Sequence, residues 1–321
     1  MRFSVHDHLN EAQPLVEALI NAGHVLSSDG PTDLFLLDLD PDMWGYRDIA
    51  AFYRECGAVV LQYPHGAPFS TLVYDNLYAP AEEVDGQLTY GQGEIDFLRS
   101  INVERPAKIM GWDLCRQFEF RPTDNPRRVV FAPTHVNGDG TIDASRAQTN
   151  ADVFRDLLEG DWELVVRFIG DLERVGLWRD DRVFRYVPGR LDMTTVEIDV
   201  ADCVVAGAGT YPCLAIARGV PTIMYGQFAA AMYGLEGEEP KPLRSLEKYR
   251  EIVRYPFDVE DAGDSPVHSL SQMIYYACDS DRLIRDWKKR WIGEPFSPEA
   301  FVAMVEVWIP ELRETRSLQA A

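Results

Sequence analysis

The sequence predicts an α/β protein built from two doubly wound domains and a C-terminal group of helices. Short apolar segments alternate with amphipathic helical segments, which is the pattern of a parallel sheet covered on both faces. A polar, proline-rich segment, RPTDNPRR at 121–128, interrupts this alternation, which then starts again. The chain has 321 residues, 46% of them hydrophobic, and can therefore form two domains of ordinary size.

The first half begins with a regular alternation of strands and helices. In chain order we predict a strand at 2–5, a helix at 11–23, a strand at 33–39, a helix at 46–57 and a strand at 58–64. Leu15, Leu19 and Ile20 fall on one face of the first helix, and Gly23 closes it. The sequence is then polar and turn-rich to about residue 95, and a further short strand is predicted at 107–112.

The second half repeats the alternation and ends in helices. We predict strands at 129–134, 163–169, 183–188, 203–207 and 221–225, and helices near 147–159, 192–201 and 211–218. Three more helices are predicted at 269–278, 281–291 and 298–309. The predicted domains are therefore 1–122 and 128–275, with helices in 276–321 that pack back towards the first domain.

Charge and cysteine content limit the class of protein. The net charge of −21 disfavours a broad surface for duplex DNA or anionic membranes, because such surfaces need clustered lysine and arginine. The five cysteines are odd in number and form no Cys-x-x-Cys pair, which predicts reduced core residues. The N-terminus lacks an apolar signal core, and no apolar run is long enough for a membrane span. We therefore expect a cytoplasmic protein with no transmembrane segment.

The segment VVAGAGTYPCLAIARGVPTI, at 204–223, predicts a strand, a Gly-x-Gly-Thr turn and a helix. Gly207, Ala208 and Gly209 are small enough for close approach of a ligand, and Thr210 adds a hydroxyl. The following helix points its N–H groups and the positive end of its dipole at the turn, which favours an anion such as a phosphate. Glycine placed there only for packing is the alternative interpretation.

This segment resembles the C-terminal domain of GT-B glycosyltransferases, including UDP-sugar enzymes and the CDP-glycerol glycerophosphotransferases. Those families carry Ala-Asp before an apolar strand, a Gly/Ser/Thr turn, and a helix that ends in Gly-x-Pro. VVFAPTH at 129–135 resembles the element that opens their donor domain, and KIMGWD at 108–113 resembles the segment before it. The resemblance implies a GT-B-type fold, in which two Rossmann-like domains face a cleft. The first would bind the acceptor and the second a nucleotide donor.

The resemblance also implies roles for individual residues. Gly209 and Thr210 would contact the donor diphosphate, with Gly207 and Ala208 supplying close backbone. Further donor-binding candidates are Arg167 near the phosphates, Tyr186 and Val187 at the nucleobase, and Thr134 and His135 at the edge facing the first domain. The alternative for Arg167 is a side chain that extends into solvent from a strand end. The helix YPCLAIARG lacks the early glutamate that holds ribose in many relatives, which weakens UDP against CDP, GDP or dTDP.

Histidines near predicted strand ends are candidates for a catalytic base, since imidazole titrates near neutral pH. His6, Asp7 and His8 leave the first strand, and His8 oriented by Asp7 is one candidate. A metal site, or helix capping with exposed histidines, are the alternatives. His65 follows the third strand, and His65-Gly66 resembles the catalytic His-Gly of the glycerophosphotransferases. The tryptophan and lysine that flank that motif are missing here. We rank His65 slightly above His8.

The predicted function is transfer of a sugar from a nucleotide-diphosphate donor, with a UDP-sugar favoured, to an acceptor hydroxyl. We expect inversion with a histidine base, no metal and no tightly bound cofactor; the Asp-x-Asp spacing of Asp38 and Asp40 lies in the half assigned to the acceptor. The alternatives are a nucleotide-sugar 2-epimerase or hydrolase of the same fold, and a non-catalytic GT-B-like binding protein. The acceptor stays open, with nucleic acid disfavoured by the acidic charge.

Overall fold

The computed structural model describes residues 1–6, 12–28, 30–38, 46–64, 83–100, 104–115, 120, 123, 126–132, 162–166, 198–206, 210–224, 270–279 and 281–319. The chain forms two units. The first comprises Met1–Arg116 together with Lys289–Ala321, and the second comprises Gln117–Lys288. Each unit contains a parallel sheet.

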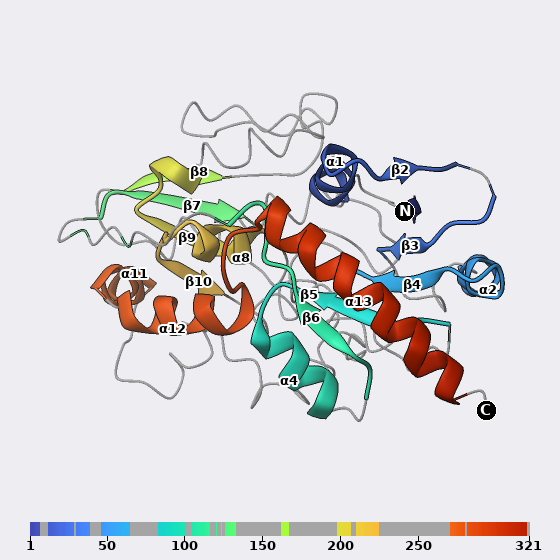
Figure 1. The fold of residues 1–321 in the computed structure, drawn as a ribbon. Helices are drawn as coiled ribbons and strands as arrows, with labels where there is room; N and C mark the ends of the chain where they lie inside the picture. Colours follow the sequence, from blue (N-terminus) through green and yellow to red (C-terminus); the bar gives the residue numbers. More distant parts are fainter. Residues whose placement is uncertain are drawn as a thin grey trace, which may run out of the picture. The chain divides into compact units, whose positions relative to one another are not determined.

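The first unit is built on a six-stranded parallel sheet with the order β2-β1-β3-β4-β5-β6 (Figure 1). Its strands are β1 (Arg2–His6), β2 (Val25–Leu26), β3 (Leu34–Leu37), β4 (Val59–Gln62), β5 (Gly86–Thr89) and β6 (Ala107–Ile109). The helices α1 (Gln13–Asn21), α2 (Arg47–Glu55) and α4 (Gln92–Ser100) connect them. Crossovers that contain a helix are what parallel neighbours require, so this arrangement confirms the predicted α/β class.

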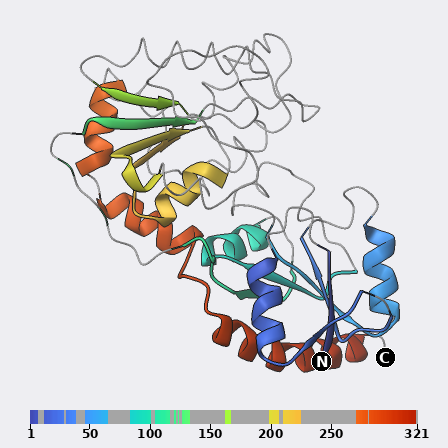
Figure 2. The same cartoon turned by 90° about the horizontal axis from the view of Figure 1, so that it is seen from above.

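The two faces of this sheet are covered by different helices. Phe3, Leu36 and Leu61 point to one face, where they pack with α1 and with the C-terminal helix α13 (Pro298–Gln319). Phe35 and Val60 point to the other face, beneath α2. Figure 2 shows α13 running along the sheet beside α1. Because β3 and β4 carry apolar residues on both faces, these two central strands are near-continuous hydrophobic runs.

Two details of these helices differ from the sequence-based prediction. Ile20 was placed on the apolar face of α1, but it is 47% exposed, whereas Leu15 and Leu19 are buried. Helix α13 was predicted to end at Ile309, before a proline, but it continues to Gln319 with Pro310 inside it. Proline removes one backbone hydrogen bond there. The contacts that the helix makes beyond Pro310 compensate for that loss.

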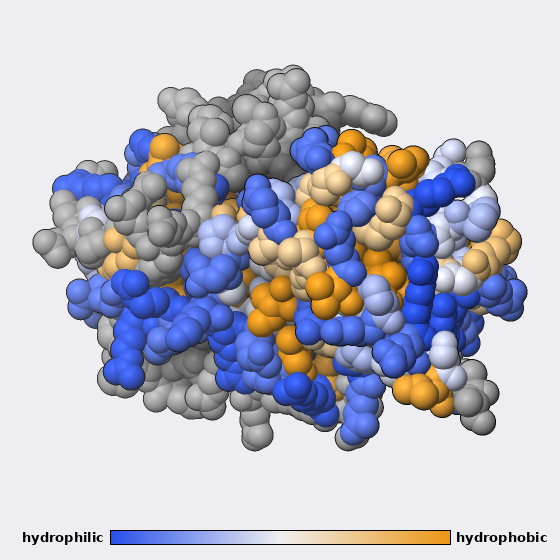
Figure 3. All heavy atoms as spheres, in the orientation of Figure 1, coloured by the Kyte–Doolittle hydropathy of each residue, from blue (hydrophilic) through white to orange (hydrophobic). Residues whose placement is uncertain are grey.

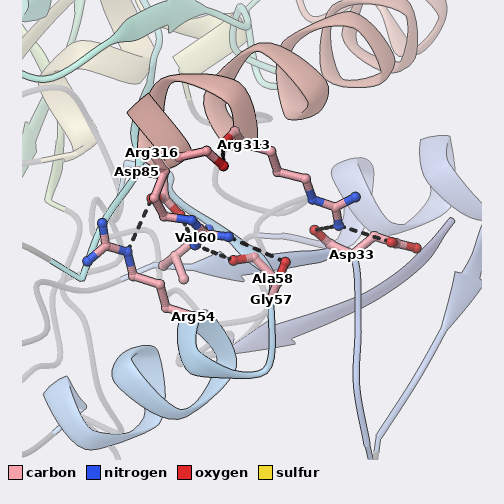
Figure 4. A network of polar contacts seen from close by, with 9 residues as sticks. Asp33, Arg54, Gly57, Ala58, Val60, Asp85, Arg313 and Arg316 are labelled. Carbon is pink, nitrogen blue, oxygen red and sulfur yellow. Dashed lines mark hydrogen bonds and ion pairs between the residues drawn. The ribbon is translucent and has the colours of Figure 1, made fainter. Parts of the chain in front are cut away.

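Those contacts lie at the amino ends of the strands and are shown in Figure 4. Arg316 donates to the carbonyl of Ala58 at 3.0 Å and pairs with Asp85 at 3.4 Å. Asp85 also pairs with Arg54 of α2, at 3.2 Å, and accepts the backbone N–H of Val60 at 2.9 Å. The last turns of α13 are therefore bound to the loops that precede β4 and β5.

Arg313 of α13 makes a second such contact, with Asp33 before β3. Its guanidinium lies 3.0 Å from Asp33 Oδ1, and Asp33 also accepts the N–H of Arg2 at 2.8 Å. These two hydrogen bonds, that from Arg2 being the stronger influence, lower the pKa of Asp33. A lowered pKa in the folded state stabilises the protein above the unfolded-state pKa of about 3.9, and this contribution is lost on acidification.

We therefore expect Asp33→Asn to lower the melting temperature at pH 7 and to have less effect at pH 3. At pH 3 more of the Asp33 carboxyl is protonated in both the folded and the unfolded wild type. The melting temperatures of the wild type and the variant therefore become more similar. Thermal unfolding at pH 7, 5 and 3 checks the prediction, with Asp286→Asn on an exposed helix face as control. A difference that stays constant over this pH range would contradict it.

The stretch before residue 95, which the sequence left without regular structure, contains β5 and the start of α4. Gly86 lies against Trp308, since a Cβ added there would be 2.8 Å from the indole ring. Glu94, which is buried, accepts the N–H of Tyr90 at 2.6 Å and so binds the first turn of α4 to the residue that follows β5. These elements are held by tertiary contacts rather than by a strong local pattern.

The second unit has a four-stranded parallel sheet with the order β10-β9-β7-β8. Its strands are β7 (Arg128–Ala132), β8 (Glu163–Val166), β9 (Cys203–Ala206) and β10 (Thr222–Met224), and its described helices are α8 (Thr210–Ala217), α11 (Leu270–Asp279) and most of α12 (Asp281–Trp291). Helix α11 packs on β9 and β10. The carboxylate of Asp202 accepts the N–H groups of Arg127 and Arg128, both at 2.8 Å, which ties the start of β7 to β9.

The hydropathy of the surface differs between helices. Figure 3 shows apolar side chains at the surface alongside α1 and α13, and hydrophilic side chains over α12.

The cysteines follow the sequence-based prediction with one exception. The five cysteines form no disulfide, and all of them are described. Four are buried, but Cys56 at the end of α2 is exposed, which corrects its prediction as a core residue. Burial raises the pKa of the Cys203 thiol, and the neighbouring Cys278 raises it further.

Candidate functional site

The first sheet reverses its strand order between β1 and β3. From β1 the chain proceeds to β2 on one side, and then to β3 and the remaining strands on the other side. Open parallel sheets bind ligands at the carboxyl ends of the strands, where the order reverses in this way. His6 is the last residue of β1, and in the register of the two strands it pairs with Leu37, the last residue of β3.

At this point His6 and Asp38 are in direct contact. His6 Nδ1 lies 3.1 Å from Asp38 Oδ1, the Asp38 side chain is fully buried, and 25% of the His6 side chain is exposed. Two aromatic residues hold the histidine. The ring of Tyr46, at the start of α2, lies 4.1 Å from the imidazole centroid, and the Tyr63 hydroxyl donates to the His6 carbonyl at 3.1 Å. The pair therefore comes from the ends of β1 and β3, and residues at the start of α2 and after β4 hold the histidine.

The pair has a defined chemical capability. An ionised carboxylate can only accept a hydrogen bond, so the contact requires a hydrogen on His6 Nδ1. In neutral imidazole the second nitrogen, Nε2, then carries a lone pair and can take a proton. Within the residues that the structure describes, Nε2 of His6 has no hydrogen-bond partner. This arrangement is that of a base oriented by a carboxylate.

A row of polar side chains continues from this pair across the sheet. Because paired residues of parallel strands point to the same face, His6, Leu37, Gln62 and Gln87 share one line on the face of α2. Gln62 and Gln87 are buried, and the guanidinium of Arg105 donates to both carboxamide oxygens, at 2.9 and 3.2 Å. The apolar face under α2 thus becomes polar towards the carboxyl ends of the strands.

The second sheet reverses its order between β7 and β9. From β7 the chain proceeds to β8 on one side, and then to β9 and β10 on the other side. The last residues of the two central strands, Ala132 and Ala206, pair with each other. Helix α8 begins at Thr210, with three residues between it and the end of β9, and its residues 211–217 are buried. A fixed helix therefore starts at the carboxyl edge of this sheet, where its N-terminus favours anions.

Most residues predicted from the sequence to form the site lie outside the described residues. These are Asp7, His8, His65, Thr134, His135, Arg167, Tyr186, Val187, Gly207, Ala208 and Gly209. Thr210 is described as the first residue of α8, without its side chain. Their assigned roles stay predictions. In the sequence, residues 134–135 follow β7 closely and 207–209 follow β9 directly, which are the two strands at the reversal.

The sequence-based reasoning missed the contact between His6 and Asp38. It named His6 only as a neighbour of His8, and it set Asp38 aside as part of an Asp-x-Asp spacing in the first half. Both residues stand at the ends of predicted strands, which was a usable signal. The missing information was that β1 and β3 are adjacent in the sheet.

Across the described part of the chain there is no group of three or more histidine, cysteine, aspartate or glutamate side chains that could hold a metal ion. In the same part of the chain, no helix has both the length and the apolar character needed to cross a membrane.

Comparison with known proteins gives fold-level relationships. No protein-family model and no curated protein sequence matches the chain. Among solved structures, a protein described as a UDP-N-acetylglucosamine 2-epimerase from Listeria monocytogenes matches with a TM-score of 0.55 and 11% identity over 97% of this chain and 96% of that chain. The UDP-GlcNAc 2-epimerase from Methanocaldococcus jannaschii matches with a TM-score of 0.53 and 11% identity, over 96% of this chain and 100% of that chain.

A third structure is the wall teichoic acid polymerase TagF. One of its variants matches with a TM-score of 0.52 and 10% identity, over 98% of this chain and 89% of that chain. At these identities the likeness concerns the fold and not the activity. The parallel sheets, the C-terminal helix and these matches together show that the chain has the fold of GT-B-type enzymes.

Proposed function

We propose that this protein is a glycosyltransferase that moves a sugar from a nucleotide-diphosphate donor to an acceptor hydroxyl. The observation that carries the proposal is the reversal of strand order in both sheets, each with suitable chemistry at its carboxyl edge. In the second unit, the N-terminus of α8 follows the small residues Gly207, Ala208 and Gly209 in the sequence and suits a diphosphate. In the first unit, the edge carries a histidine and an aspartate in contact.

The donor would be bound through the backbone N–H groups at the start of α8 and the hydroxyl of Thr210. As the bond to the sugar breaks, charge develops on the leaving diphosphate, and N–H groups directed at that charge stabilise the transition state. Arg167 would add a positive charge, and Tyr186 and Val187 would contact the nucleobase. This mechanism places the donor in the second unit and the acceptor in the first, with a UDP-sugar as the favoured donor.

Calorimetric titration with UDP, CDP, GDP and dTDP tests the proposal. We expect one nucleotide to bind with an affinity in the range of common KM values, about 1 μM to 1 mM. Binding by none of the four would overturn the proposed function.

Replacement of Thr210 by valine is expected to weaken the binding of that nucleotide by about tenfold or more. The variant keeps the shape of the side chain but removes a hydroxyl that hydrogen-bonds a charged phosphate, which contributes about 1.5–3 kcal/mol. Thr222→Val is the matched control, because the Thr222 hydroxyl donates to the Val220 carbonyl within the strand region and should leave the affinity unchanged. Equal affinities for the wild type and Thr210→Val would remove Thr210 from the donor site.

A 2-epimerase of the same fold is the second candidate, because two of the matching structures are described as UDP-GlcNAc 2-epimerases. Incubation with UDP-GlcNAc and no acceptor separates the two functions. An epimerase changes the configuration at C2 of the sugar, which NMR detects, whereas a transferase releases UDP slowly to water. Nucleotide binding without either reaction would indicate a binding protein of this fold.

A further inference from the structure

We propose that His6, oriented by Asp38, is the base that takes the proton from the acceptor hydroxyl. This assignment rests on the proposed function, and it selects a histidine other than His8 and His65. The two residues come from the ends of adjacent strands at the reversal of the first sheet, where a ligand is expected. The position of His6 and Asp38 at this edge, and the contact between their side chains, support this role.

The buried carboxylate sets the orientation of the imidazole. Asp38 is fully buried in its side chain and accepts from His6 Nδ1 at 3.1 Å. Burial of an ionised carboxylate is costly without hydrogen-bond donors, and His6 Nδ1 supplies one such donor to Asp38. The other ring nitrogen, Nε2, belongs to a side chain that is one quarter exposed at the carboxyl edge. Part of the His6 side chain is therefore accessible at the edge where a ligand is expected.

The groups around the imidazole support a base. Among the described residues that touch His6, the titratable ones are Asp38 after β3, Tyr46 at the start of α2 and Tyr63 after β4. The Tyr63 hydroxyl is directed at the His6 carbonyl, and the Tyr46 ring contacts the imidazole at a tilt of 54°. No positively charged side chain is in contact with His6 in this described environment, so no nearby cation opposes the imidazolium that forms when His6 takes a proton.

The acceptor oxygen forms a bond to the anomeric carbon while its proton passes to His6 Nε2. The bond from that carbon to the diphosphate oxygen breaks, and its electron pair leaves with the nucleotide diphosphate. Asp38 stabilises the resulting imidazolium, which then releases its proton to solvent. Attack from the side opposite to the leaving group gives inversion at the anomeric carbon.

His6→Gln is the first variant for the test. Glutamine keeps a polar side chain but cannot take the proton, and general base catalysis contributes about 10²–10⁴-fold to a rate. The assay follows release of nucleotide from UDP-glucose, or from the corresponding conjugate if another nucleotide binds, with water as acceptor. We expect turnover to fall by at least about 100-fold and nucleotide affinity, measured by calorimetry, to change by less than about twofold. His24→Gln is the control, because His24 lies near Met1 and Glu306, before β2.

Asp38→Asn tests the positioning role of the carboxylate. The amide can donate to Nδ1, which would move the hydrogen of the imidazole to Nε2 and block the base without removing it. We expect kcat to fall by at least about tenfold with KM nearly unchanged. Nitrogen chemical shifts of His6 by NMR should show hydrogen on Nδ1 in the wild type and on Nε2 in the variant. Circular dichroism confirms that both variants are folded.

The outcomes separate the two proposals. If no nucleotide binds to the wild type, the proposed function fails and the base role fails with it. If the wild type binds and turns over donor, and His6→Gln does so at the same rate, the assignment of His6 alone is overturned. Loss of turnover in His65→Gln or His8→Gln, with His6→Gln unaffected, would identify the base as one of those histidines.

Discussion

Replacement of Trp308 by alanine is expected to lower the free energy of unfolding of the first unit by about 3–5 kcal/mol, the usual range for a buried tryptophan. Trp308 lies in the middle of α13, is only 3% exposed, and belongs to the core cluster shared by α1, α13 and β1, β3, β4 and β5. Its ring covers Gly86 so closely that a Cβ there would clash. Removal of the ring leaves a cavity between the helix and β5 that a glycine cannot fill.

Val307→Ala is the matched control for this experiment, since Val307 is the preceding residue on the same helix and is 62% exposed. Its replacement should change the free energy of unfolding by less than about 0.5 kcal/mol. Urea denaturation followed by far-ultraviolet circular dichroism avoids reliance on tryptophan fluorescence. A loss below 1 kcal/mol in Trp308→Ala would mean that α13 is not an integral part of the core of the first unit.

The sequence predicted β3 and β4 because these strands are apolar on both faces, as strands in the middle of a parallel sheet are. It did not predict β5, whose residues Gln87 and Thr89 are polar yet buried. Gln87 is accommodated by Arg105, which follows it by 18 residues in the sequence. A partner at that distance gives no local periodic signal, and the strand was therefore missed.

The candidate site could also be predicted only in part from the sequence. The ends of the strands that carry His6 and Asp38 could be predicted within one or two residues. Their contact depends on the order of strands in the sheet, in which β3 lies beside β1 and not beside β2. Strand order results from tertiary packing, and sequence patterns of single elements do not encode it. For this reason the aspartate appeared in the sequence only as part of an isolated Asp-x-Asp spacing.

The two sheets share an arrangement that no single sequence motif shows. In each sheet, polar or small residues follow the two strands at the reversal, which are β1 and β3 in the first sheet and β7 and β9 in the second. The first sheet offers a base at this point, and the second offers the positive end of a helix. Transfer from a diphosphate donor to a hydroxyl needs both of these groups, which is why we favour a transferase.

Replacement of Asp85 by alanine is expected to cost about 3–5 kcal/mol of stability, as for other broken buried ion pairs. The Asp85 side chain is 5% exposed and accepts from Arg54, from Arg316 and from the backbone N–H of Val60. The N–H of Asp85 in turn donates to the Val60 carbonyl at 2.9 Å, so this residue fixes the start of β5 beside β4. Alanine would remove the carboxylate that Arg54, Arg316 and the N–H of Val60 share, and would leave Arg316 with only its carbonyl acceptors at Gly57 and Ala58.

An exposed ion pair provides the control for Asp85. Asp281 pairs with Arg285 at 3.0 Å on α12, where both side chains are about half exposed, and Asp281→Ala should cost less than about 0.5 kcal/mol. Urea denaturation of both variants gives the comparison, and a similar small loss for the two would contradict the role assigned to Asp85. A large loss in Asp85→Ala alone would show that the same carboxylate holds α2, α13 and the β4–β5 register together. The contact of Arg105 with both Gln62 and Gln87 depends on that register, since Gln62 pairs with Gln87 only when Leu61 pairs with Gly86.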